Sequence, residues 1–185
     1  MDRVMVQRAQ HGDHEAFDRL VTAAFPRLWA VARRVVGDHH AAEDAVQECL
    51  LQAWRDLRAL RDPDRFEAWL YRLLVNACRD VGRSARRRKV EVVGTTLEAA
   101  DRRTAIDEVE LQDQLSRGFA RLSVEHRAAL VLHHYHGLTS REIADLLGVP
   151  EGTITSRLHY AIRAMRSALE ADLRPRPTAT QGDGR

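Results

Sequence analysis

The 185-residue sequence contains almost no lysine, since Lys89 is the only one and the other 28 basic residues are arginines. Aromatic residues are also scarce, at 5% of the chain. The two cysteines, Cys49 and Cys78, lack the CxxC spacing that is typical of zinc sites. This pattern implies neither a zinc site nor a disulfide scaffold, and we expect two buried free thiols in a reducing compartment.

Long hydrophobic runs and catalytic motifs are missing as well. The first residues, MDRVMVQRAQHGD, contain no apolar core of a signal peptide, and no apolar stretch is long enough to span a membrane. We therefore expect a cytoplasmic protein without membrane insertion. The sequence has no P-loop and no nucleophile elbow, so we expect no enzymatic activity and no cofactor.

A histidine cluster invites a metal-site interpretation. His133 and His136 are one helical turn apart, with His134 between them. No cysteine or carboxylate near them completes a ligand set with suitable spacing. We expect these histidines to be structural and the chain to hold no metal.

The formal net charge of +2 conceals a strong segregation of charge along the chain. Residues 1–82 have a net charge of −1, whereas residues 83–89 (RSARRRK) hold five positive charges and no negative one. Residues 90–118 then have a net charge of −4, and residues 119–185 of +2. A basic segment followed by an acidic one, poor in large apolar residues, predicts a tether between two folded halves. Residues 174–185 are rich in proline and glycine and are expected to be disordered.

Apolar residues recur with helical spacing throughout the first half. We predict a helix capped by Asp13 and ended by Pro26, where a second helix begins. Gly37 and Asp38 predict a turn and a cap before a third helix, from residue 39 to about residue 60. Pro63 predicts the start of a fourth. Alternating strand patterns are absent, so the fold class is all-α.

The second half carries the pattern of a helix-turn-helix. Thr139 and Glu142 have the spacing of a capping box, which predicts the start of a short helix. Ala144, Gly148 and Ile154 have the spacing of a small contact residue, a permissive turn and a core position. A short three-helix core without DNA binding is the alternative. We also predict a helix capped by Ser123 and a final helix over residues 151–173.

The final helix presents polar residues where such a motif enters the major groove. The candidate contacts to bases and phosphates are Thr153, Thr155, Ser156, Arg157, His159, Tyr160 and Arg163. Apolar residues at the complementary positions, Ile154, Leu158, Ile162 and Met165, are expected to face inward. An ordinary solvated face is the alternative interpretation.

The first half carries a second candidate DNA surface and an acidic one. Arg72, Asn76, Arg79 and Arg83 have spacings of four, three and four residues and so share one helix face. Arginine can hold phosphate and asparagine can pair with a base edge, although a solubilising stripe is the alternative. Tyr71, if exposed, could stack on unpaired bases, whereas Trp69 is expected in the core. The acidic and amide face is formed by Asp44, Gln47, Glu48, Gln52 and Asp56. It would repel DNA and favours a protein partner.

Three segments together resemble the extracytoplasmic-function sigma factors, the minimal specificity subunits of bacterial RNA polymerase in the sigma-70 family. They are AEDAVQECLLQAW (42–54), RFEAWLYRLLVNACRD (65–80) and the block from residue 122 to residue 166. The resemblance implies two small helical domains, sigma region 2 at residues 1–88 and a region 4 helix-turn-helix at 107–173. A flexible linker at 89–106 would join them, and a disordered tail would span 174–185.

The resemblance also implies roles for particular residues. Asp44, Gln47 and Glu48 match the helix that docks on the coiled coil of the polymerase's largest subunit. The segment with Arg61, Asp64, Arg65 and Phe66 matches the loop that captures a flipped base of the minus-10 element, and Asn76 matches the recognition asparagine. Thr155, Ser156, His159 and Tyr160 occupy the positions that read the minus-35 element, where the common family pattern often has arginine at 155 or 160.

The function implied is therefore promoter-specific transcription initiation with core RNA polymerase, including assistance to DNA melting. Promoter DNA and an anti-sigma factor, which commonly covers both domains in this family, are expected partners. A free-standing DNA-binding regulator built on the helix-turn-helix is the second hypothesis. It would leave the acidic face and the Asn76 stripe without a purpose.

Overall fold

The computed structural model describes residues 2–91 and 115–172, and within these ranges the chain is helical between short turns, without a β-strand. The all-α prediction is confirmed. The first half consists of α1 (Arg3–Gln10), α2 (His14–Val36), α3 (His39–Asp56) and α4 (Phe66–Glu91). Two short 3-10 turns, Leu57–Ala59 and Pro63–Arg65, connect α3 to α4.

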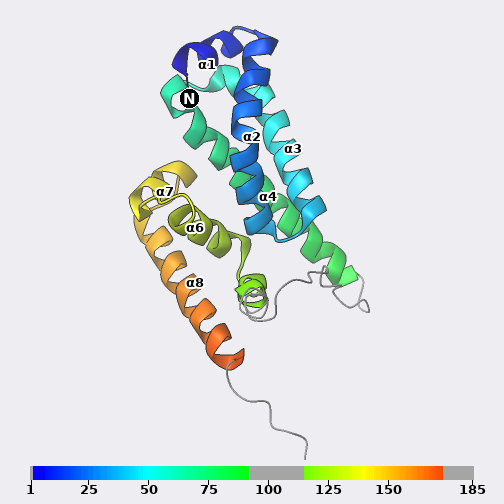
Figure 1. Cartoon of the computed structure of the whole chain (residues 1–185), viewed down its shortest axis with the longest axis vertical. Helices are drawn as coiled ribbons and strands as arrows, with labels where there is room; N and C mark the ends of the chain where they lie inside the picture. Colours follow the sequence, from blue (N-terminus) through cyan, green and yellow to red (C-terminus); the bar gives the residue numbers. More distant parts are fainter. Residues whose placement is uncertain (1, 92–114, 173–185) are drawn as a thin grey trace, which may run out of the picture.

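Helices α2, α3 and α4 run side by side as a bundle, and α1 packs against α2 at one end (Figure 1). The bundle encloses a core of fully buried aliphatic and aromatic side chains, which include Leu20, Leu28, Val31, Val35, Phe66, Leu70 and Leu74. Hydrophobic burial at helical spacing on one face of each helix therefore explains why these segments associate.

The predicted caps of the first half are confirmed. The Asp13 carboxylate accepts a hydrogen bond from the backbone N–H of Ala16 at 3.0 Å, and Asp38 accepts one from Ala41 at 2.8 Å. Gly37 ends α2 with φ of 85°, a left-handed conformation that glycine adopts without steric cost. These local devices set where α2 and α3 begin and where α2 ends.

The predicted break at Pro26 is wrong, because α2 runs unbroken from His14 to Val36 with Pro26 inside it. Pro26 lies on the exposed face, where the ring meets solvent. The buried residues before and after it, such as Leu20 and Leu28, stay on one face against the bundle. Continuous burial of that face therefore outweighs the lost backbone hydrogen bond.

The second half contains a helical segment at residues 115–120, then α6 (Val124–His134), α7 (Ser140–Leu147) and α8 (Glu151–Asp172). Thr139 and Glu142 form the predicted capping box, and Ser123 caps α6. Gly148, with φ of 67°, ends α7 and turns the chain into α8. The helix-turn-helix prediction is thus confirmed in its local structure.

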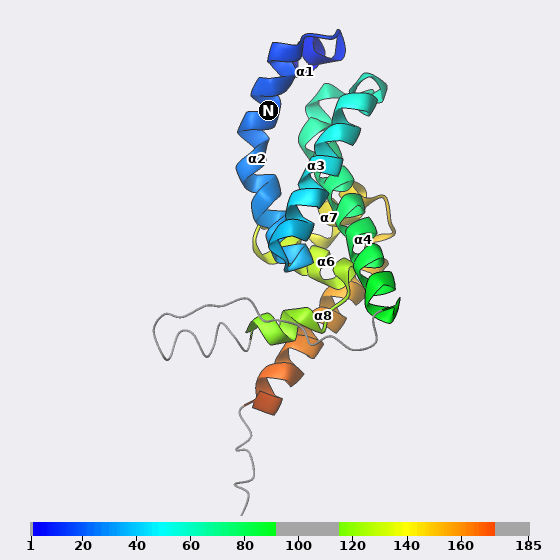
Figure 2. The same ribbon diagram turned by 90° about the vertical axis from the view of Figure 1, so that its right-hand side faces the viewer.

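The two halves pack against each other. Helix α2 contacts α6, and α4 contacts both α6 and α7, so that buried side chains form one continuous hydrophobic cluster (Figures 1 and 2). Helix α4 continues to Glu91, past the predicted boundary at residue 88. Most of the predicted linker and the predicted tail lie outside the described residues.

No helix in the described ranges is both long and apolar enough to cross a lipid bilayer.

Replacement of Pro26 by alanine tests why α2 is continuous. Alanine supplies the missing N–H donor in a helix interior, where proline is about 3 kcal/mol less favourable. We expect P26A to raise the free energy of unfolding by about 1–3 kcal/mol, measured by urea denaturation. The matched control, A23G at a neighbouring exposed position, should lower it by about 1 kcal/mol. A less stable P26A protein would contradict this account of α2.

Candidate nucleic-acid interface

The acidic residues predicted to dock a protein partner lie on the exposed face of α3. Asp44, Gln47 and Glu48 are all exposed, while Ala45, Val46 and Cys49 of the same helix are buried in the bundle. The spacing of these two sets divides α3 into a core face and a solvent face. The three carboxylate and amide side chains are therefore available to a partner.

The segment between α3 and α4 exposes its polar residues to solvent, while two apolar residues anchor it in the core. Asp62 accepts a hydrogen bond from the backbone N–H of Asp64 at 3.1 Å, which fixes the turn, and the Asp64 carboxylate pairs with Arg3 at 2.6 Å. Arg61 and Arg65 are exposed. The anchor is formed by Pro63 and Phe66, which are buried.

Arg72, Asn76, Arg79 and Arg83, here called the α4 stripe, lie along the side of α4 that meets the second half. Asn76 is half-buried, and its Oδ1 accepts a hydrogen bond from Arg79 Nη1 at 3.1 Å. Arg79 Nε in turn lies 3.8 Å from Glu125 Oε1 on α6. Arg83, which is exposed, pairs with Asp80, and the exposed Arg72 reaches the turn at Gly148. The four predicted residues are thus brought together on one face.

Tyr71 does not meet the condition of exposure on which its stacking with unpaired bases depends. Tyr71 is 7% exposed, and its hydroxyl lies 3.4 Å from Nδ1 of His136, between α4 and the end of α6. Burial raises the pKa of the Tyr71 phenol, to which Glu67 also contributes. Trp69, expected in the core, is only partly buried, beside Phe66. The tyrosine is covered because the second half packs on α4, a contact that the local pattern did not reveal.

The first four turns of α8 present most of the predicted recognition residues to solvent. Thr155, Ser156, His159 and Arg163 are exposed, and Thr153 is half-buried. The backbone carbonyl of Glu151 accepts a hydrogen bond from the Thr155 hydroxyl at 3.2 Å. These residues therefore form one polar face beyond the turn of the helix-turn-helix.

Two predicted recognition residues of α8 are turned toward α6. The ring of Tyr160, which is 57% exposed, lies 4.5 Å from the ring of His126. Arg157 is half-buried. Burial lowers the pKa of His126, and the charge of Arg157 lowers it further. Burial opposes ionisation of Glu125, whose pKa is nevertheless lowered, in part by the charge of Arg157. Arg157 therefore belongs to the same electrostatic cluster as Arg79 of α4.

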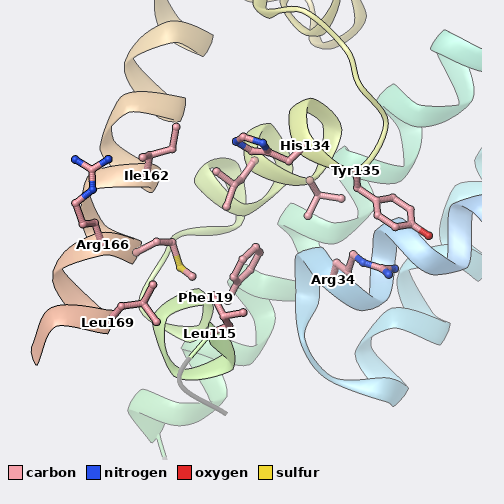
Figure 3. A pocket seen from close by; sticks show the side chains of 11 residues that line it. Arg34, Leu115, Phe119, His134, Tyr135, Ile162, Arg166 and Leu169 are labelled. Atoms are coloured by element: carbon pink, nitrogen blue, oxygen red, sulfur yellow. The ribbon is translucent and has the colours of Figure 1, made fainter. Parts of the chain in front are cut away.

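The inward orientation expected for Ile162 is also wrong, since its side chain is 39% exposed. It borders a hydrophobic groove of about 590 Å³ with Phe119, Met165 and Leu169, and Leu115 is 39% exposed at the same groove (Figure 3). Ile154, Leu158 and Met165 are buried as expected. The helical period alone did not separate a core position from the wall of an open groove.

The contacts between the halves were not foreseen from the sequence. Arg127 donates a hydrogen bond to the carbonyl oxygen of Val36 at 3.0 Å, and the Arg34 guanidinium lies 3.9 Å from the ring centroid of Tyr135. At this distance the cation and the ring attract each other. The partners are separated by about a hundred residues, and no local pattern indicates such a pair.

The three clustered histidines have different surroundings. Nδ1 of His133 donates to the carbonyl oxygen of Leu138 at 2.7 Å, His136 faces Tyr71, and His134 is exposed beside the groove. Among the described residues, no group of three or more histidine, cysteine or acidic side chains is arranged to hold a metal ion.

The cysteines are free and fully buried, as predicted. Burial raises the pKa of Cys49 and of Cys78 to about 12, so both thiols remain protonated at neutral pH. They are therefore unreactive compared with an exposed cysteine.

A helix-turn-helix with an exposed polar face, combined with an arginine and asparagine stripe on another helix, is typical of a DNA-binding protein. Residues 20–88 match the family Sigma-70 region 2, and residues 112–165 match Sigma-70, region 4. The chain therefore belongs to the sigma-70 family. It is an extracytoplasmic-function sigma factor, a promoter-recognising factor of RNA polymerase.

Individual relatives agree with this assignment. The chain is 41% identical over 152 residues to the ECF RNA polymerase sigma factor SigL of Mycobacterium tuberculosis, covering 77% of this chain and 82% of SigL. A solved structure of the sigma factor RpoE with the anti-sigma factor NepR from Bartonella quintana superposes with a TM-score of 0.66 at 28% identity, covering 84% of this chain and 98% of that one. CnrH in complex with the cytosolic domain of CnrY superposes with a TM-score of 0.65 at 27% identity, covering 92% and 98%.

The contact between the halves should weaken in acid because of His136. Burial lowers the pKa of His136 below its ordinary value of 6.5, aided by Arg27 and Arg34 and opposed by Glu67. The folded state therefore favours the neutral imidazole of His136. The stability that this neutral imidazole contributes is fully present above about pH 6.5, and it is lost as the pH falls toward the lowered pKa of His136.

We expect the free energy of unfolding to fall more steeply between pH 7.5 and 5.5 in the wild type than in H136Q, measured by urea denaturation. H134Q, at an exposed neighbouring position, serves as the control and should keep the wild-type slope. Equal slopes for H136Q and the wild type would contradict the assignment to His136.

Proposed function

We propose that this sigma factor docks on core RNA polymerase through α3, reads the minus-10 element with α4 and its preceding turn, and reads the minus-35 element with α8. The observation that carries the proposal is the distribution of three polar surfaces over three helices of one chain. An acidic surface on α3 is separate from the basic surfaces on α4 and α8, which suits one protein partner and two DNA contacts.

The α3 surface is suited to the coiled coil of the polymerase's largest subunit. Asp44, Gln47 and Glu48 lie within about one and a half turns of an exposed face and leave the core side of α3 intact. The carboxylates would be repelled from DNA phosphates but can pair with basic groups of a protein. Docking there would bring the two DNA-reading surfaces to the polymerase as one unit.

The minus-10 proposal combines the turn before α4 with the α4 stripe. Arg61 and Arg65 are exposed cations for phosphate, and Asn76 supplies an amide that can pair with a base edge. A base must leave the stack before its pairing edge can be read, so recognition of a flipped base also favours strand opening. Tyr71 could take part only after α4 is uncovered, because it is buried against His136.

The minus-35 proposal places α8 in the major groove. Thr155, Ser156, His159 and Tyr160 would face base edges, whereas Arg157 and Arg163 would meet phosphate or base. Thr153, in the first turn of α8, lies where backbone N–H groups favour a phosphate. None of the base-reading positions 155, 156, 159 and 160 is arginine, so we expect a minus-35 sequence different from the common family preference.

An anti-sigma factor is a further expected partner. The solved structure with 28% identity is a complex of a sigma factor with an anti-sigma factor, and the similarity extends over 84% of this chain. We propose that a protein inhibitor also holds this factor inactive in the cell.

Reconstitution with core polymerase tests the proposal as a whole. Purified core enzyme with the full chain should initiate transcription on a genomic fragment library, while neither component alone should. E48R should reduce affinity for core enzyme about tenfold or more, because the new arginine would be repelled by the basic groups of the partner that are expected to pair with Glu48. E15R changes an exposed carboxylate of α2 and should leave affinity unchanged. Absence of initiation on any fragment would refute the proposed function.

Substitution of His159 tests the orientation of α8. We expect H159A to relax selection at one position of the minus-35 element, with a loss of about 1–3 kcal/mol of discrimination, or about 5- to 150-fold. Promoter selection in vitro with the reconstituted holoenzyme measures this change. S167A, at an exposed position about two turns further along α8, should keep the wild-type preference. Unchanged selection by H159A would place another side chain at the base edge.

A further inference from the structure

Helix α1 lies at the same end of the first bundle as the turns that connect α3 to α4 (Figures 1 and 2). It contacts both 3-10 turns of residues 57–65, here called the connecting loop. This loop supplies Arg61, Asp64 and Arg65 to the proposed minus-10 surface. The loop is therefore held from two sides, by the helices that it connects and by α1.

Gln10, the last residue of α1, closes the first turn of the connecting loop. Its side-chain Nε2 donates to the carbonyl oxygen of Leu57 at 3.1 Å and to that of Leu60 at 2.7 Å. The Leu57 carbonyl also accepts a hydrogen bond from the backbone N–H of Leu60 at 3.1 Å, so both ends of this turn meet at one half-buried amide. An amide has two N–H groups to donate, whereas a carboxylate of the same size has none.

Arg3, in the first turn of α1, contacts the second turn of the connecting loop. Its Nη1 lies 2.6 Å from Oδ2 of Asp64, and the two side chains are 56% and 58% exposed. An ion pair so open to solvent contributes little to the stability of the fold. The pair does neutralise a carboxylate in the segment that is proposed to approach DNA phosphates.

Helix α1 is itself fixed to the bundle and can serve as a support. Val6 and Ala9 are buried on its inner face. At its other end, Arg8 Nη2 lies 2.7 Å from Oδ2 of Asp13, which ties α1 to the start of α2. The position of the connecting loop consequently depends on α2 as well, through α1.

We propose that α1 takes part in reading the minus-10 element, with Gln10 as a positioning residue that holds the connecting loop in its reading conformation. A loop that is ordered before DNA arrives loses less conformational entropy on binding. Arg3 contributes by keeping the Asp64 carboxylate paired, so that this carboxylate does not repel the DNA backbone. The inference rests on the proposed function for what the loop reads, whereas the support of the loop by α1 follows from the contacts themselves.

Hydrogen exchange in the free full chain tests whether Gln10 fixes the loop. Q10E keeps the size of the side chain but removes its donors, so we expect the backbone N–H of Leu60 to exchange about tenfold faster or more. Q7E makes the same change at an exposed glutamine of α1 and should leave this rate unchanged. The N–H of Ala42, bonded to the carbonyl of Asp38 at the opposite end of α3, should keep its rate in both variants. A wild-type rate for Leu60 in Q10E would overturn the support of the loop.

Promoter selection in vitro with the reconstituted holoenzyme tests the consequence for DNA. Q10E should relax base preference in the minus-10 element about tenfold, while preference in the minus-35 element and affinity for core polymerase stay at wild-type values. Q10K restores donors at a similar reach and should recover most of the minus-10 preference. Unchanged minus-10 preference in Q10E would overturn the role of Gln10. Equal losses in all three quantities, without recovery in Q10K, would assign Gln10 to stability alone.

A double-mutant cycle tests the contribution of Arg3. R3A should keep the wild-type free energy of unfolding, because the pair is exposed, but should weaken promoter binding by the holoenzyme about two- to fivefold at low salt. In a D64N background, R3A should have no further effect, because the carboxylate that Arg3 neutralises is gone. A continued loss there would mean that Arg3 binds DNA directly and would overturn its pairing role. R19A breaks an exposed pair with Glu15 on α2 and should leave promoter binding unchanged.

The two proposals fail in distinguishable ways. If wild-type protein and core polymerase never initiate, the proposed function fails, while the exchange rate of the Leu60 N–H still reports on the support of the loop. If transcription occurs but Q10E keeps the wild-type minus-10 preference, the role of α1 is wrong and the promoter-reading function stands.

Discussion

The structure depends on one constraint, which is that α4 packs against helices of both halves of the chain, α2 and α3 on one side and α6 and α7 on the other. Leu70 and Leu74 of α4 are buried between α2 and α3, and they form part of the hydrophobic core that holds the first bundle together. The remaining side of α4 carries arginines and an asparagine, and α6 and α7 pack on it. On this side α4 meets the second half through the pair Arg79–Glu125 and the close approach at Gly82, in addition to the hydrophobic cluster that continues between the halves.

Local patterns predicted the elements well, because capping and helical periodicity act within a few residues. Asp13, Asp38 and Ser123 were each predicted as caps, and each accepts the hydrogen bond expected of it. The capping box before α7 and the turn at Gly148 were recognised for the same reason. In each case the partner atoms lie within one turn of the residue that signals them.

The errors share a physical origin, which is that packing between distant segments decides them. Pro26 stays inside a helix because the buried face of α2 is continuous across it. Tyr71 is covered by a residue 65 positions away, and Ile162 borders a groove whose other wall includes Phe119. Of the candidate site, the residue types and helix faces could be predicted, whereas burial by the other half could not. The roles assigned to these residues at a promoter stay predictions.

The dominance of arginine over lysine suits a surface with two alternative partners. A guanidinium remains charged in a half-buried position and offers several donors in a plane, so it can bind a carboxylate or a phosphate. Arg79 is half-buried, and burial together with the charge of Arg157 lowers its pKa without a consequence for its charge at neutral pH. A lysine ammonium, more strongly hydrated, would lose more on the same burial. The small net charge thus reflects cations that are already matched by acids of the same chain.

The hydrogen bond from Arg127 to the carbonyl oxygen of Val36 has a consequence for how far the halves are independent. The last carbonyl groups of a helix carry partial negative charge and have no partner within the helix. Here a cation from α6 meets one of them, so the end of α2 is completed by a residue 91 positions later in the chain. The first half contains all the apolar residues of its bundle, yet one of its helices is finished by the second. Separating the two halves would therefore leave the Val36 carbonyl at the end of α2 without its hydrogen bond from Arg127. The two halves are distinct in sequence, yet they share hydrogen bonds.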